Sequence, residues 1–295
     1  MSNSTEKINN SGEVLAWSMY DFANQPFTNL VLTFIYGTFF TTVIASNEIV
    51  GTQQWSHAIS ITAIVVALLS PFMGALADKG GYRKMFMFFF TWLTIIATTV
   101  LYFVLPGQVI RALFWFVLAN IGFEMGSVFC NAYLPDISHS KNIGRISGYG
   151  WSLGYVGGLL SLALAMFFLV QTDTPIFGFL KGEAGAYQNI RATNLLVAVW
   201  FAVFSIPTFL FVKDKKPDTK AFLKNAKHTL KGFRSTANEL RSYPQIIRFL
   251  LARLVYNDGL VTVFAFGGIY AAGSLNFTFD EIMVLGIVLN ITAGI

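Results

Sequence analysis

Long runs of apolar residues alternate with short polar stretches along the whole chain. The apolar runs cover residues 15–45, 54–77, 85–105, 109–133, 147–170, 191–212 and 245–272, and an eighth begins at Asp280. Each of the seven complete runs is long enough to cross a hydrocarbon layer of about 30 Å, which takes roughly 20 helical residues. Because lipid offers no partner for an unpaired N–H or C=O, and because no alternating barrel pattern occurs, these runs predict an all-α polytopic membrane protein.

The composition supports this interpretation. Charged residues make up 12% of the 295, about half of the share that is usual in soluble proteins, and Phe alone occurs 30 times. The polar segment before the first span lacks the basic region, the short apolar region and the small-residue cleavage site of a secretory signal. The first span is therefore expected to stay in the mature protein. Cys130 is the only cysteine, which excludes an internal disulfide.

The positions of the basic residues predict the orientation. If the N-terminus is cytoplasmic, the cytoplasmic segments hold sixteen of the twenty Lys and Arg, the outer segments and their margins hold three, and Arg253 lies within the seventh span. The positive-inside rule then places the N-terminus in the cytoplasm, in what we expect to be a bacterial inner membrane. The net charge of +5 is thus a topology signal, and nothing in it indicates a nucleic-acid partner.

A long basic segment divides the chain. We expect a six-span N-terminal unit (1–213), a basic cytoplasmic segment (214–244) and the first two helices of a second unit (245–295). The basic segment is interpreted as a connector held against anionic lipid headgroups, in preference to a binding site for a regulatory partner.

A weak internal repeat agrees with this division. The first span begins LAWSMYD (15–21), and the seventh contains LARLVYND (251–258). Two parallel halves related by an axis along the membrane normal would produce such a repeat. Two halves of this size need about twelve spans, so the chain is expected to be cut short within its eighth.

The loop after the second span carries the most specific motif, GALADKGGYRK, from Gly74 to Lys84. Its small residues let helices approach closely, Asp78 can accept from N–H groups at a helix start, and Gly81 permits a tight turn. The motif resembles the G-x-L-A-D-[RK]-x-G-x-[RK]-[RK] signature of the major facilitator superfamily. That resemblance implies a cytoplasmic latch between inward-facing and outward-facing states, with Asp78 and Arg83 as its charged parts.

Other short motifs narrow the resemblance. DFAN (21–24), NAYLPDI (131–137), GYGWSLGYVGG (148–158) and YNDG (256–259) are similar to the fungal vacuolar, autophagy-related amino-acid effluxers and their bacterial relatives, the "unknown major facilitator" family. The resemblance runs from Trp17 to about Gly273. It implies a twelve-span permease, with amino-acid efflux as the activity of some members.

A polar stripe marks the first span. Asp21, Asn24 or Gln25, and Thr28 recur at three- and four-residue steps, which puts them on one face of a helix. Pro26 cannot donate to the carbonyl of Phe22, which leaves that acceptor free. The stripe is typical of the wall of a water-filled cavity, and the alternative for Asp21 is a structural pairing near the interface.

A second stripe, Asn120, Glu124, Ser127 and Asn131, lies along the fourth span. Glu124 is deep in this span, where burial favours a role as proton carrier unless a cation such as Arg253 or Arg111 holds it ionised. The alternative is a structural ion pair or hydrogen bond between helices.

Two further spans have distinctive residues. The fifth carries a small-residue strip that includes Gly150, Gly154 and Gly158, for which close helix packing is the favoured interpretation. The seventh has the densest polar group inside a membrane segment and adds candidates for solute or ion contact. Its members are Arg253, Tyr256, Asn257, Asp258 and Thr262.

Phosphate-loop, metal-ligand and hydrolase-elbow motifs are absent from the sequence, so we expect neither an enzyme nor a cofactor or metal site. The predicted function is a secondary transporter of a small polar solute that works by alternating access in the lipid bilayer. Amino-acid efflux is implied by the resemblance, and the proton is the candidate coupling ion. The competing hypothesis is a non-transporting protein on the same scaffold, either a lipid scramblase or a nutrient sensor. The oligomeric state is left open.

Overall fold

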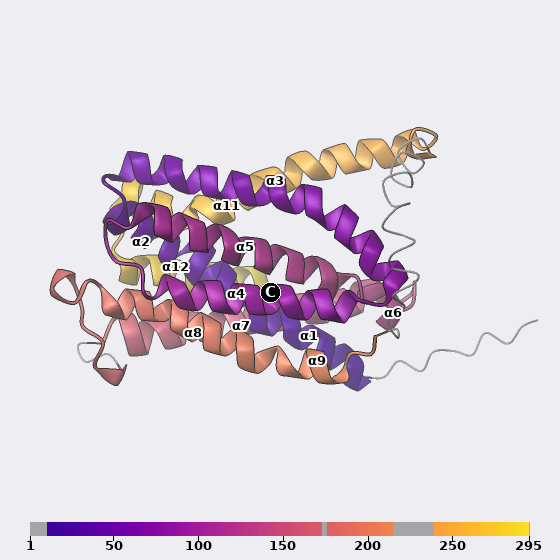
Figure 1. Cartoon of the computed structure of the whole chain (residues 1–295), viewed down its shortest axis with the longest axis horizontal. Helices are drawn as coiled ribbons and strands as arrows, with labels where there is room; N and C mark the ends of the chain where they lie inside the picture. The colour runs from indigo at the N-terminus through magenta and orange to yellow at the C-terminus, as the bar shows by residue number, and fades with distance from the viewer. Residues whose placement is uncertain (1–10, 173–175, 215–238, 295) are drawn as a thin grey trace, which may run out of the picture.

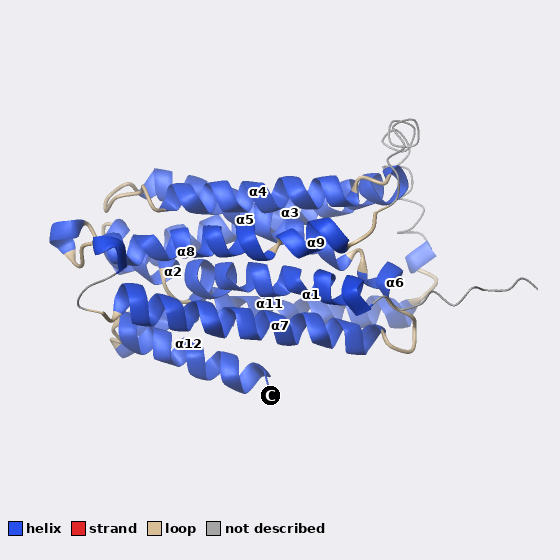
Figure 2. Cartoon of the chain, turned by 90° about the horizontal axis from the view of Figure 1, so that it is seen from below, coloured by secondary structure: helices blue, strands red, loops and turns tan. Residues whose placement is uncertain are grey.

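The computed structural model describes residues 11–172, 176–214 and 239–294, and these residues form helices and connecting loops without strands. Among the described residues, seven helical segments are long and apolar enough to cross a membrane, and they run side by side along one direction (Figures 1 and 2). The predicted all-α membrane bundle is therefore confirmed. An eighth helix, α12 (Phe279–Gly294), follows where the eighth apolar run was predicted. Most of the basic segment 214–244 lies outside the described residues.

The first span is not a single regular helix. It consists of α1 (Ser11–Pro26), the π-helix η1 (Phe27–Thr33), the short helix α2 (Tyr36–Phe39) and the π-helix η2 (Phe40–Ile44). Pro26 ends the α-helical part because it has no N–H for the ladder. The break in regular hydrogen bonding occurs at this residue, within the polar stripe, between Gln25 and Thr28.

The other spans are more regular. The second, third and fourth spans are α3 (Glu48–Gly80), α4 (Arg83–Leu101) and α5 (Val109–Asn131), followed by the short α6 (Leu134–Ile137). The fifth and sixth spans are α7 (Ile143–Ala165) with η3 (Met166–Val170), and α8 (Gln188–Phe204) with α9 (Ile206–Phe211). The loop between them contains the 3-10 turns η4 (Ile176–Gly178) and η5 (Glu183–Gly185). The seventh span is α11 (Pro244–Leu275).

The first span lies at the centre of the bundle. Its most apolar window is 78% buried, against 11% for the second span and 6% for the seventh. Around it, α7, α8 and α9 pack most extensively on α1, α3 and α11 pack on the later part of the span, and α4 packs along α5. One apolar cluster around Phe39, Trp55 and Phe116 fills the bundle toward the start of α3, and another around Trp17 and Phe129 fills the opposite half.

The opposite half ends in loops and helix starts that carry Arg83, Lys141, Arg145 and Lys213, and we call this end of the bundle the basic end. In α11 the buried residues are Ala265, Gly268, Ile269 and Ala271, all in its C-terminal half. A Cβ atom on Gly268 would overlap the carbonyl oxygen of Thr33, so α11 touches the first span closely there. Its first half, toward the basic end, extends away from the bundle (Figure 1).

Candidate functional site

The contact between α1 and α7 is the closest helix approach in the polar part of the first span. A Cβ atom on Gly150 would clash with the Oδ2 atom of Asp21, and one on Gly154 would lie 3.5 Å from the Cβ atom of Asp21 and 3.6 Å from Oε1 of Gln25. One turn further, Gly158 leaves room for the side chains of Gln25 and Asn29. The small-residue strip of the fifth span therefore accommodates the polar face of the first.

The carbonyl of Phe22, which Pro26 leaves without a helical donor, accepts a hydrogen bond from another helix. The indole Nε1 of Trp200 in α8 donates to the oxygen of Phe22 at 3.0 Å. The rings of Phe22 and Trp200 also stack, with centroids 5.2 Å apart. On the other side, a Cβ atom on Gly157 would overlap the same carbonyl group. The predicted free acceptor thus becomes the point where α1 meets both α7 and α8.

Asn24 and Gln25, which the sequence could not separate, face different helices. The amide of Asn24 donates to the Oγ atom of Ser127 in α5 at 3.4 Å, whereas Gln25 lies against α7. Thr28 follows in η1 and is half-buried. The polar stripes of the first and fourth spans therefore meet at Asn24 and Ser127.

The residues of the polar stripe on the fourth span differ in burial along α5. Asn120 is 4% exposed, and its Oδ1 atom has no partner among the described residues. Glu124 is half-buried and Asn131 is exposed. In the part of the chain that the structure describes, Glu124 makes no ion pair. Neither of the counter-charges considered for it, Arg253 or Arg111, pairs with it there.

The polar group of the seventh span lies apart from the polar stripes of the first and fourth spans. Arg253, Asn257 and Asp258 are exposed, and Tyr256 is 70% exposed. All four lie in the half of α11 that extends away from the bundle. Thr262 bonds only within its own helix, to the carbonyl of Asp258 at 2.9 Å.

The loop between α3 and α4 joins three segments at the basic end. Gly81 ends α3 in the left-handed region with φ 70°, and its N–H bonds to the carbonyl of Ala77. Arg83 donates to Asp136 at 2.5 Å and to the carbonyl of Ala132 at 3.2 Å, which fixes the start of α4 to the segment around α6. The backbone N–H of Lys84 donates to Asp214 at 2.9 Å.

One motif residue, Gly74, differs from its expected contribution. A Cβ atom on Gly74 would meet no other atom within 4 Å, so this glycine makes no close helix contact here. The side chain of Asp78 lies outside the described residues.

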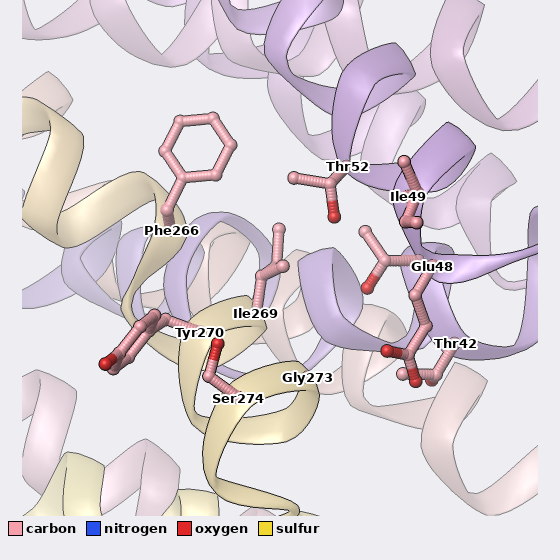
Figure 3. Close-up of a pocket in the computed structure, with 10 residues that line it drawn as sticks. Thr42, Glu48, Ile49, Thr52, Phe266, Ile269, Tyr270, Gly273 and Ser274 are labelled. Atoms are coloured by element: carbon pink, nitrogen blue, oxygen red, sulfur yellow. The ribbon is translucent and has the colours of Figure 1, made fainter.

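A pocket of about 410 Å³ lies between η2, α3 and α11, at the end opposite to the basic end (Figure 3). The side chains of Glu48, Thr52, Tyr270 and Ser274 are among those that line it. A Cβ atom on Gly273 would lie 3.3 Å from Oε2 of Glu48. The pocket shows where the first two spans approach the seventh.

Asn29 and Arg191 are buried polar residues whose contacts the sequence reasoning did not predict. Asn29 donates to the Oδ1 atom of Asn290 in α12 at 3.2 Å and so ties the first span to the eighth. Arg191, counted with the outer margins from sequence, is only 5% exposed and donates to the carbonyls of Ala186 at 2.8 Å and Tyr102 at 2.7 Å. From sequence, Arg191 could be placed only at the start of the sixth apolar run. That position does not indicate whether its side chain faces the solvent or the interior of the bundle.

The arrangement matches known membrane transporters in fold. A solved structure of the xylose transporter XylE from E. coli, in a partially occluded inward open conformation, has a TM-score of 0.51 with 12% sequence identity, covering 95% of this chain and 70% of that one. This likeness shows a major facilitator-type helix bundle.

Sequence comparison gives the family. Residues 55–295 match the model of the family described as vacuole effluxer Atg22 like, and the chain belongs to this family. It is 26% identical over 267 residues to the uncharacterized MFS-type transporter YxiO of Bacillus subtilis, covering 87% of this chain and 59% of the relative. It is 20% identical over 315 residues to autophagy-related protein 22 of Yarrowia lipolytica, covering 81% and 51%. The chain therefore spans between 51% and 59% of the length of these relatives.

Proposed function

We propose that the protein is a secondary active transporter of a small polar solute, with amino-acid efflux as the favoured activity and the proton as coupling ion. The observation that carries the proposal is the meeting of two polar stripes inside the bundle, where Asn24 of the first span bonds to Ser127 of the fourth. Ionisable and amide groups at this depth are costly, and membrane proteins retain them mainly along solute and ion pathways. The membership of an MFS-type family supports the same conclusion.

Glu124 is the proposed proton carrier. It lies one turn from Ser127 on α5 and has no ion-pair partner in the described residues. A carboxyl group without a fixed counter-charge can take up and release a proton without breaking a salt bridge. Asp21, held against Gly150 of α7, is the second candidate acid.

The orientation with the N-terminus in the cytoplasm, in a bacterial inner membrane, belongs to the same proposal. Arg83, Lys84, Lys141, Arg145 and Lys213 all lie at the basic end, as the positive-inside rule requires of a cytoplasmic face. The contact of Arg83 with Asp136 at this end supports a latch that changes between conformational states.

The test is flux through the full-length protein in liposomes. A panel of labelled amino acids is offered with and without an inward or outward proton gradient. Gradient-dependent solute movement that Glu124→Gln abolishes, and that the matched change Glu183→Gln in the exposed loop leaves intact, is the expected result. Transbilayer movement of fluorescent lipid without any solute flux would instead establish the competing scramblase function.

A further inference from the structure

A second polar groove lies at the basic end, between α1 and α7, and no part of the proposed transport site includes it. Its volume is about 440 Å³. Much of its lining is apolar, from Val14, Leu15, Ile146 and Leu153. The remaining lining residues carry hydroxyl groups or a cation, and none carries a carboxylate. These are Ser11, Ser18, Arg145, Tyr149 and Ser152.

Ser18 is the buried donor of this groove. It is 1% exposed, yet its Oγ atom has no hydrogen-bond partner among the described residues. A serine inside a helix commonly bonds back to a carbonyl of the preceding turn, and Ser18 makes no such bond. Because a buried hydroxyl without a partner costs free energy, an acceptor supplied by a ligand would relieve that cost.

Arg145 supplies the charge on the opposite wall. Within the described residues its guanidinium makes no ion pair, and it lies in the first turn of α7, where the N-cap residue Asn142 provides no side-chain cap. Backbone N–H groups at a helix start favour an anion, and a guanidinium binds carboxylate and phosphate oxygens through two parallel hydrogen bonds.

The two acids of the neighbouring α1 helix do not line the groove. On α1, Glu13 accepts from the backbone N–H of Lys213 at 2.9 Å and does not line the groove. Asp21 lies deeper, against Gly150. Arg145 is therefore the charged side chain that lines the groove in the described part of the chain.

We propose that this groove is an oxyanion-binding site for a carboxylate or phosphate group, held by Arg145 from one wall and Ser18 from the other. The inference goes beyond the proposed transport function, since it concerns binding at equilibrium and holds whether or not the protein moves a solute. The same chemistry fits a free anion in solution and the phosphate of an anionic lipid headgroup, and the experiment separates these two sources.

The first measurement is binding of radiolabelled inorganic phosphate to the full-length protein in neutral detergent at constant ionic strength. Arg145→Gln should weaken binding about tenfold or more, and Ser18→Ala about threefold, since hydrogen bonds to a charged group are the stronger kind. Lys141→Gln is the matched control, because Lys141 is an exposed cation of the preceding loop that does not line the groove.

The second measurement counts phosphatidylglycerol molecules that the protein retains in native mass spectrometry after purification from phosphatidylglycerol–phosphatidylcholine nanodiscs. Phosphate binding lost in both groove variants and kept in Lys141→Gln supports the site with a free anion as its source. Retained phosphatidylglycerol lost in the same two variants supports the site with a headgroup as its source. Absence of both, or equal losses in all three variants, overturns the proposal. If Arg145→Gln fails to fold, the comparison of Ser18→Ala with Lys141→Gln decides it.

Discussion

The contact between Gly157 and the carbonyl of Phe22 makes a quantitative prediction. A Cβ atom on Gly157 would overlap the carbonyl oxygen of Phe22 in α1 and lie 3.1 Å from its carbonyl carbon, and backbone cannot move aside as a flexible side chain can. Gly157→Ala must therefore push α1 from α7 or distort one of them. Gly148, on the same helix, has no such neighbour within 4 Å and provides the control Gly148→Ala.

The magnitude follows from comparing the two variants. Each replaces glycine by alanine within α7, so the gain in helix propensity of about 0.5–1 kcal/mol is common to both and cancels. What remains is the overpacking at Gly157, which costs about 1–3 kcal/mol in well-packed interiors. The displaced carbonyl also accepts from Trp200, so the true difference is expected in the upper part of this range.

The assay is reversible unfolding of the purified protein in mixed micelles with increasing dodecyl sulfate, followed by circular dichroism. We expect Gly148→Ala to unfold at or slightly above the wild-type midpoint and Gly157→Ala clearly below it. Equal midpoints for the two variants would refute the close approach of α1 and α7, and with it the argument that the glycine strip accommodates the polar face of the first span.

Other variants test single contacts. Trp200→Phe keeps the stacking on Phe22 but removes the donor to its carbonyl, and should lower the free energy of unfolding by about 1–3 kcal/mol in the same assay, whereas an unchanged value would mean that another donor replaces the indole. Arg83→Gln removes the ion pair with Asp136 and should slow solute exchange while equilibrium solute affinity stays within about twofold, because this architecture binds its solute near the membrane midplane; a loss of affinity at normal exchange rate would contradict the latch. Glu124→Gln should fold normally, since it breaks no ion pair in the described residues, and should lose proton-driven accumulation while retaining exchange; a protein that still concentrates solute on a proton gradient removes Glu124 from the mechanism.

Several features of the protein could be predicted because they depend on local sequence. The membrane-spanning helices follow from runs of apolar residues, since a chain in lipid has few alternatives to a helix that bonds its own backbone. The acceptor at Phe22 follows from Pro26 four residues later, and the turn at Gly81 follows from a residue that adopts positive φ without strain. Each of these conclusions needs only neighbours within a few positions along the chain.

The partners of the polar side chains required the tertiary structure. Asn24 and Gln25 are adjacent in sequence, yet one faces α5 and the other α7, and Asn29 meets Asn290 across 261 residues. Arg191 turns inward to the carbonyl of Tyr102, while the polar residues around Tyr256 stay exposed. The physical reason is that lipid tails are as apolar as leucine, so hydropathy distinguishes membrane from water but does not distinguish the lipid-facing side of a helix from the side that packs on another. Only the packing of the helices against one another determines which side of each helix faces the lipid.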